Sequence, residues 1–192
     1  MEQEVQVSDT AEMYGNGRTE DLVGVAIAPM REQVFLVSKV LPTNASAKGV
    51  GQSCRRSLRH LGTDRLDLYL LHWRGSVPLA ETVEAFRTLQ REGLIRHWGV
   101  SNFDTDDMRD LEQCANPGEC AANQVLYSLE HRGVEYDLLQ ADMQRRVVTM
   151  AYSPIGQGGA LLAHPALGRV AARHGTSLGA ATPAQVALAW VL

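Results

Sequence analysis

The hydrophobic pattern of the chain alternates between short apolar runs and longer stretches of helical periodicity. The run from Asp67 to Leu71 is almost wholly apolar, is too short for an ordinary helix, and ends on His72 and Trp73. Turn-forming residues bound it, Gly62 on one side and Gly75 on the other. Because strands that are apolar on both faces are typical of parallel sheets covered by helices, we predict a buried strand over 66–71.

Five further segments have strand character, and helical patterns separate them in strict alternation. Right-handed crossovers would then place the helices outside one parallel sheet. No glycine-rich G-x-G-x-x-G follows the first strand, which disfavours a dinucleotide-binding doubly wound fold. A (β/α)8 barrel remains, although it needs eight strands and about 250 residues. The predicted strands are 5–8, 34–40, 66–71, 96–100, 122–125 and 147–152, and the predicted helices are 19–28, 44–61, 79–92, 106–113, 136–145, 165–174 and one that begins near 182.

The composition of the chain limits the number of domains, the partners and the location that we predict. With 192 residues and 45% hydrophobic positions, the chain can bury a sizeable core, so we predict a single domain over 1–192. The net charge is −4, the pI is about 5.8, and basic residues are scattered, a pattern that favours neither a nucleic-acid nor a membrane surface. The acidic start and the lack of any membrane-length apolar run predict a cytoplasmic protein.

Three cysteines, Cys54, Cys114 and Cys120, do not make an even disulfide framework, and free thiols suit a reducing compartment. No His or further Cys stands at metal-ligand spacing beside them, so we expect no metal site.

Polar or titratable groups come directly after each predicted strand. Alone, each has an ordinary structural explanation: His72 as a core histidine, Lys39 as a solvated lysine. Together they favour a functional site, because the carboxyl ends of parallel strands meet at one mouth. The groups are Asp9 with Tyr14, then Lys39, His72, Ser101 with Asn102, Gln124, and Tyr152 with Ser153.

An Asp, a Tyr, a Lys and a His suit one kind of chemistry. A phenol, with an ordinary pKa of about 10, becomes a competent acid beside an ammonium group that favours the phenolate. A carboxylate can hold the lysine, and a neutral imidazole can orient a carbonyl oxygen. Delivery of a proton to that oxygen requires a hydride for the carbon, which implies a nicotinamide cofactor. A metal-dependent barrel hydrolase, the alternative enzyme class, would need more carboxylates or His pairs at strand ends.

Several long motifs resemble the aldo-keto reductases, which are NADPH-dependent carbonyl reductases built on the (β/α)8 barrel. The residue Trp73 and the run 123–127 look most like bacterial members that reduce small aldehydes, methylglyoxal among them. The matching stretches are Asp9–Gly15, Leu61–Trp73, Gly93–Phe103 and Ala151–Pro154.

The resemblance implies a role for each catalytic candidate. Tyr14 would be the proton donor, Lys39 would lower the pKa of that phenol, Asp9 would position Lys39, and His72 would orient the carbonyl. The substrate wall would include Trp73, with Met13 as a further candidate.

The resemblance also implies a cofactor site for NADPH, with NADH left open. The carboxamide would be held by Ser101, Asn102 and Gln124, the nicotinamide ring would stack on Tyr152, and Ser153 and Ile155 would lie along the pyrophosphate.

This sequence departs from the family pattern at both ends. Only Met1 to Ser8 precede the Asp-Thr-Ala loop, and the chain stops at Leu192, before the family's eighth strand with its Ile-Pro-Lys segment and adenosine-phosphate contacts. We therefore expect an incomplete barrel of about six β/α units, lacking the first and eighth, with unpaired edge strands and marginal stability. Two hypotheses stay open: an active carbonyl reductase, and an inactive or cofactor-sensing fragment.

Overall fold

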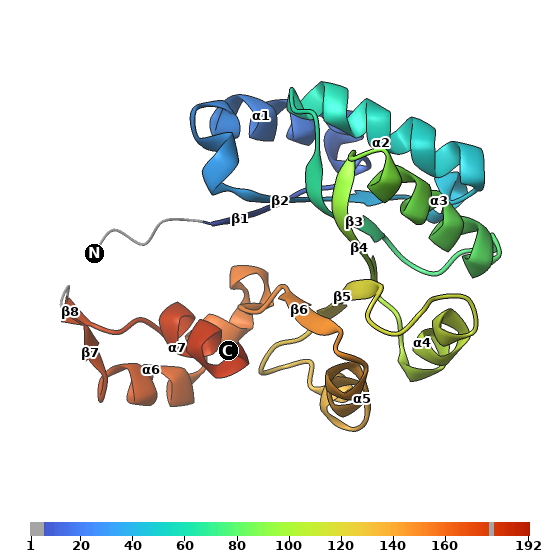
Figure 1. Cartoon of the computed structure of the whole chain (residues 1–192). Helices are drawn as coiled ribbons and strands as arrows, with labels where there is room; N and C mark the ends of the chain where they lie inside the picture. The colour runs from blue at the N-terminus through green and yellow to red at the C-terminus, as the bar shows by residue number, and fades with distance from the viewer. Residues whose placement is uncertain (1–5, 177–178) are drawn as a thin grey trace.

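The computed structural model describes residues 6–176 and 179–192, in which six strands form one sheet in the order of the sequence. Every neighbouring pair of these strands is parallel. The strands follow an arc with helices on its outer side, and β1 and β6 are its two edges (Figure 1). The strands are β1 (Val7–Asp9), β2 (Phe35–Val40), β3 (Leu66–Leu71), β4 (Ile95–Ser101), β5 (Cys120–Leu126) and β6 (Val148–Tyr152).

The helices alternate with these strands, which confirms the predicted strand–helix units. A small antiparallel pair, β7 (Gly175–Thr176) and β8 (Gly179–Ala180), was not predicted and follows α6, which ends earlier than expected. The helices are α1 (Arg18–Ile27), α2 (Ala47–Leu61), α3 (Leu79–Arg91), α4 (Thr105–Glu112), α5 (Leu138–Arg145), α6 (Pro165–Ala171) and α7 (Pro183–Val191).

Two predicted boundaries at the start of the chain are corrected by the structure. The loop that was expected to begin at Asp9 begins one residue later, because Asp9 pairs in register with Val37 and ends β1. The helix expected to begin at Thr19 begins one residue earlier, at Arg18, and Gly17 precedes it with a φ of 89°, a left-handed conformation that glycine adopts without strain. Val5, the first residue of the predicted strand 5–8, lies outside the described residues.

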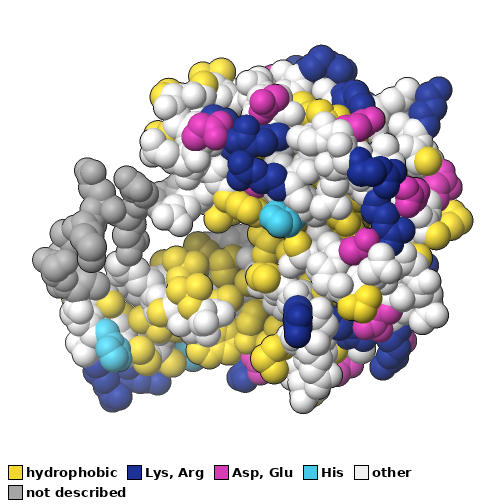
Figure 2. Space-filling model, viewed as in Figure 1, with side chains coloured by type: hydrophobic (Ala, Val, Ile, Leu, Met, Phe, Trp, Pro, Cys, Tyr) yellow, Lys and Arg dark blue, Asp and Glu magenta, His cyan; other side chains and the backbone are white. Residues whose placement is uncertain are grey.

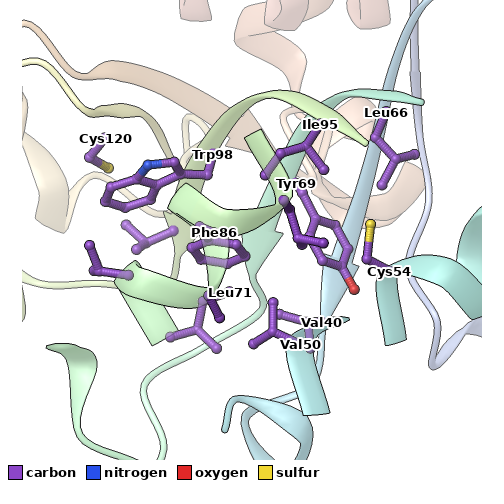
Figure 3. Packing of buried hydrophobic residues seen from close by; sticks show 14 of the residues in the cluster. Val40, Val50, Cys54, Leu66, Tyr69, Leu71, Phe86, Ile95, Trp98 and Cys120 are labelled. Atoms are coloured by element: carbon purple, nitrogen blue, oxygen red, sulfur yellow. The ribbon is translucent and has the colours of Figure 1, made fainter. Parts of the chain in front are cut away.

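The central strand β3 is buried on both faces along its whole length, as predicted. Leu68 and Leu70 contact the inner cluster of the arc, whereas Tyr69 and Leu71 belong to the larger cluster beneath the helices. In that larger cluster the Phe86 ring stacks on Trp98, with centroids 5.5 Å apart, and meets the edge of Tyr69 at 5.8 Å (Figure 3). The polar residues that follow β3 are therefore attached to a well-packed strand.

Hydrophobic side chains remain exposed near the edges of the arc. Val7 of β1 is 50% exposed and Val148 of β6 is 63% exposed. The space-filling view shows a hollow with hydrophobic side chains on the viewed face (Figure 2). Among the helices of the described residues, none has both the length and the apolar character needed to cross a membrane.

Gly99 of β4 is a position where any side chain would disrupt the sheet. A Cβ there would lie 2.3 Å from the Ala122 carbonyl oxygen and 2.9 Å from Leu70 Cδ2. We expect Gly99→Ala to lower the free energy of unfolding by about 3 kcal/mol in urea titrations, because the β5 backbone must shift. Gly51→Ala is the control: its Cβ would meet only Arg55 Nη1 at 3.4 Å, so helix propensity should raise stability by about 0.5–1 kcal/mol. Equal effects of the two substitutions would contradict this packing.

Candidate active site

Strand periodicity brings the polar candidates to one mouth of the arc. Side chains two residues apart on a strand lie on the same face of the sheet. A residue that comes two positions after an inward-facing apolar residue therefore also points inward. The inner cluster contains Val37, Leu68, Leu70 and Ala122, with Met150 packed against it. Gly99 also faces inward, because its missing Cβ would touch Leu70. Two positions after the inward members of β2 to β6 come Lys39, His72, Ser101, Gln124 and Tyr152.

Lys39 is almost completely buried, with 1% of its surface exposed. Its ammonium donates to Asp9 Oδ1 at 2.9 Å, to Asp9 Oδ2 at 2.8 Å and to the Thr10 carbonyl oxygen at 2.9 Å. These contacts use all three N–H donors of an ammonium group. The lysine is thus fixed in place by the end of β1, and it acts on other groups through its charge.

Tyr14 lies beside this buried cation in the loop after β1. Lys39 Nζ is 5.2 Å from the centre of the Tyr14 ring, and the His72 ring meets it edge to face at 5.8 Å. The Tyr14 ring is partly exposed, and its hydroxyl has no hydrogen-bond partner among the described residues. The phenol is therefore free to meet a small molecule that enters the mouth.

His72 follows β3 and is 8% exposed. Burial and the nearby Lys39 charge lower the pKa of His72 from its ordinary value of 6.5 to about 4, against smaller opposing effects of Asp9 and Glu12. The imidazole is therefore neutral at physiological pH. Its Nδ1 is buried and has no hydrogen-bond partner among the described residues.

The lowered pKa of His72 predicts a pH-dependent stability. The unfolded chain binds the proton near pH 6.5 and the folded chain near pH 4, so stability is fully present above 6.5 and falls as the pH drops toward 4. We expect the wild type to lose about 1–3 kcal/mol more than His72→Gln across this window in denaturant titrations. The exposed His97 supplies the control, since His97→Gln should keep the wild-type profile. An identical profile for His72→Gln would contradict the lowered pKa.

The side chains predicted to hold a carboxamide lie together beside His72. Asn102 Nδ2 donates to the His72 carbonyl oxygen at 3.0 Å and to Ser101 Oγ at 3.1 Å, and Asn102 Oδ1 accepts from the Tyr152 hydroxyl at 2.8 Å. Ser101 Oγ donates to the Gln124 carbonyl oxygen at 2.8 Å. Asn102 has a left-handed φ of 59°, so the chain turns sharply after β4 to make these contacts.

Gln124 and Asn102 can still form hydrogen bonds with a bound molecule. The largely buried side-chain amide of Gln124 has no partner among the described residues, and Asn102 Oδ1 keeps a second lone pair. An amide donor, an amide acceptor and the neighbouring Tyr152 ring match the functional groups of a nicotinamide carboxamide and its ring. The donor set therefore fits such a group.

The remaining candidates are Trp73 and Met13, predicted for the substrate wall, and Ser153 and Ile155, predicted for the pyrophosphate. Trp73 contacts His72, with ring centroids 4.8 Å apart, and both Trp73 and Met13 are partly exposed at the mouth. Ser153 follows β6 with a left-handed φ of 51°. The Ile155 side chain packs against a separate cluster that includes Leu161, so its predicted place along a pyrophosphate stays a prediction.

Two polar residues with contacts beside the site were missed by sequence reasoning. Glu12 is buried in the Tyr14 loop and binds groups from the connection that follows β2 and from α2. Arg74 follows Trp73 and pairs with Asp110 of α4. Their partners lie at least 29 residues away in the chain, so no local spacing indicates them.

Comparisons with known proteins find a matching family model and related sequences. A family model described as the aldo/keto reductase family matches residues 2–192. Methylglyoxal reductase YeaE of Escherichia coli (strain K12) is 50% identical over 188 residues, which cover 96% of this chain and 64% of that protein. An aldo-keto reductase of Mycolicibacterium paratuberculosis is 37% identical over 190 residues, covering 96% of this chain and 62% of that protein.

A solved structure extends the likeness to three dimensions. The crystal structure of an aldo/keto reductase from Klebsiella pneumoniae in complex with NADP and acetate matches with a TM-score of 0.90 and 50% identity, covering 97% of this chain and 65% of that chain. The chain thus spans slightly less than two thirds of the length of these relatives. The match confirms the predicted fold class, an incomplete barrel of this type with six parallel strands, and the chain belongs to the aldo/keto reductase family.

Proposed function

We propose that this protein reduces aldehydes and ketones to alcohols with NADPH or NADH, and that Tyr14 is the general acid. The observation that carries the proposal is the grouping of Tyr14, Lys39 and His72 at one mouth, with the Lys39 charge 5.2 Å from the phenol ring. A barrel scaffold alone does not require a buried lysine beside an unpaired phenol.

The protein's own residues account for the movement of the proton. The Tyr14 hydroxyl transfers its proton to the carbonyl oxygen of the substrate. The Lys39 ammonium, held by Asp9, stabilises the negative charge that develops on the phenol oxygen as the proton leaves. The neutral His72 imidazole donates a hydrogen bond to the same carbonyl oxygen and aligns it with the phenol.

The cofactor proposal rests on the amide cluster that the side chains of Asn102 and Gln124 form. Gln124 and Asn102 would bind the carboxamide of the nicotinamide, and the Tyr152 ring would support its face. When bound, the reduced nicotinamide supplies the hydride that goes to the carbonyl carbon, which with the proton from Tyr14 completes the alcohol. The NADP complex of the Klebsiella relative supports NADPH as the first cofactor to test.

The proposed substrates are small aldehydes and ketones such as methylglyoxal. Trp73 contacts His72 and Met13 precedes Tyr14 in the chain, and both expose apolar surface, which suits a short carbon chain. The name of the Escherichia coli relative, a methylglyoxal reductase, supports the same choice.

The test is NADPH oxidation, followed by absorbance, with methylglyoxal as the substrate and the alcohol identified by mass spectrometry. We expect stoichiometric conversion of NADPH and aldehyde to product. Tight NADPH binding without turnover would favour the cofactor-sensing alternative, and the absence of both binding and turnover would refute the proposal.

A further inference from the structure

Glu12 is a buried carboxylate in the loop that carries Tyr14. Its side chain is 4% exposed, and it stands two residues before the phenol. Glu12 Oε1 accepts from the Leu41 backbone N–H at 2.7 Å and from Asn44 Nδ2 at 3.0 Å. Glu12 Oε2 forms an ion pair with Arg56 of α2. These partners hold the carboxylate firmly, because loss of Arg56 would leave a buried charge without its counter-charge and loss of a neutral donor would leave an oxygen unpaired.

These contacts join three separate segments of the chain. Leu41 and Asn44 belong to the connection between β2 and α2, and Arg56 lies in the middle of α2. The backbone of the loop is fixed on the same side, since Thr10 N–H donates to the Val37 carbonyl oxygen at 3.0 Å. The loop is therefore anchored firmly up to Glu12.

Beyond Glu12 the backbone hydrogen bonds of the loop in the described residues are local: Tyr14 N–H donates to the Ala11 carbonyl oxygen at 3.0 Å, and Asn16 N–H donates to the Met13 carbonyl oxygen at 3.4 Å. Gly15, Asn16 and Gly17 all have left-handed φ values, between 53° and 89°; Gly15 and Asn16 are exposed and Gly17 is buried. The Tyr14 hydroxyl has no hydrogen-bond partner among the described residues. The position of the phenol oxygen thus depends on the backbone that Glu12 holds.

We propose that Glu12 is a positioning residue that fixes the phenol of Tyr14 relative to Lys39 and His72. This role rests on the proposed reductase function, because it supplies the alignment of the acid. A displacement of about 1 Å in a reacting group can cost on the order of 100-fold in rate. Glu12 acts through the loop and does not touch the substrate.

The experiment compares three variants with the wild type. Glu12→Ala removes every acceptor, Glu12→Gln keeps an acceptor for Leu41 and Asn44 but loses the charge, and Arg56→Gln leaves the loop sequence intact. Glu119→Gln is the matched control, because Glu119 also pairs with an arginine of the neighbouring helix, Arg87 of α3, but lies before β5, away from the mouth. The readouts are hydrogen exchange of the amides in 10–17 and in β4, and kcat and the KM for NADPH with methylglyoxal as the substrate.

We expect Glu12→Ala to speed hydrogen exchange in 10–17, and not in β4, and to lower kcat by about 100-fold with the KM for NADPH within about twofold. Glu12→Gln and Arg56→Gln should give intermediate losses, and Glu119→Gln should keep the wild-type kcat. Unchanged exchange in 10–17, or an unchanged kcat in Glu12→Ala, overturns the positioning role. If the wild type shows no turnover that depends on Tyr14, the proposed function fails, and the exchange readout alone then decides whether Glu12 holds the loop.

Discussion

Tyr14→Phe is expected to lower kcat for methylglyoxal reduction by about 1,000-fold, because a correctly placed general acid contributes about 100-fold to 10,000-fold. Phenylalanine keeps the ring that contacts His72 and Lys39 and removes only the hydroxyl, which bonds to no other described group. Folding stability should therefore stay within about 0.5 kcal/mol of the wild type. The affinity for NADPH should also be unchanged, because the amide cluster lies on other strands.

Tyr136→Phe is the control for this substitution. Tyr136 is 92% exposed and lies before α5, outside the site, so its loss should leave kcat at the wild-type value. Steady-state rates at saturating NADPH, with thermal unfolding of each variant, check both expectations. Turnover by Tyr14→Phe at the wild-type rate would show that another group delivers the proton.

Lys39→Met is expected to lower kcat by about 100-fold or more, because it removes the charge that stabilises the developing phenolate. Methionine retains much of the buried aliphatic volume, but Asp9 and the Thr10 carbonyl oxygen lose their donor. A stability loss of about 1–3 kcal/mol should accompany the change, less than for a fully buried pair, because the Asp9 side chain is 33% exposed. The variant should therefore be assayed well below its own melting temperature.

Two further variants test whether the effect is specific to Lys39 and whether it depends on Tyr14. The only other lysine of the chain is Lys48, which is exposed on α2, so Lys48→Met should be indistinguishable from the wild type. If Lys39 acts through Tyr14, the double variant Tyr14→Phe/Lys39→Met should be little slower than Tyr14→Phe alone. Fully additive losses would mean that Lys39 supports the reaction by a route that does not pass through the phenol.

Much of the fold could be predicted because local signals agreed with the final packing. The strand over 66–71 has its predicted bounds: a run of apolar residues on both faces suits only a covered strand, and Gly62, with a left-handed φ, ends the preceding helix. The start of α7 was also predicted, since Thr182 caps it and Pro183 is its first residue. The pair β7 and β8 was missed because its strands are too short to show a period.

The candidate site was predictable in part, for a geometric reason. Lys39 comes two positions after the inward-facing Val37, and His72 comes two positions after Leu70. The alternation of side chains along a strand is therefore enough to bring them to one mouth. Glu12 carries no such signal, because its importance comes from Arg56, which is 44 residues away in the chain. The role of Ile155 depends on a loop whose path the sequence does not specify.

The central claim is that Tyr14, Lys39 and His72 form one reductase site. Its most direct test uses NADPH deuterated at the transferable position of C4, with methylglyoxal, and mass spectrometry of the alcohol formed by the wild type and by Tyr14→Phe. We predict that the wild-type product carries deuterium on the former carbonyl carbon and that Tyr14→Phe forms it about 1,000-fold more slowly. Product without deuterium, or equal rates of labelled product from the two proteins, would contradict the claim.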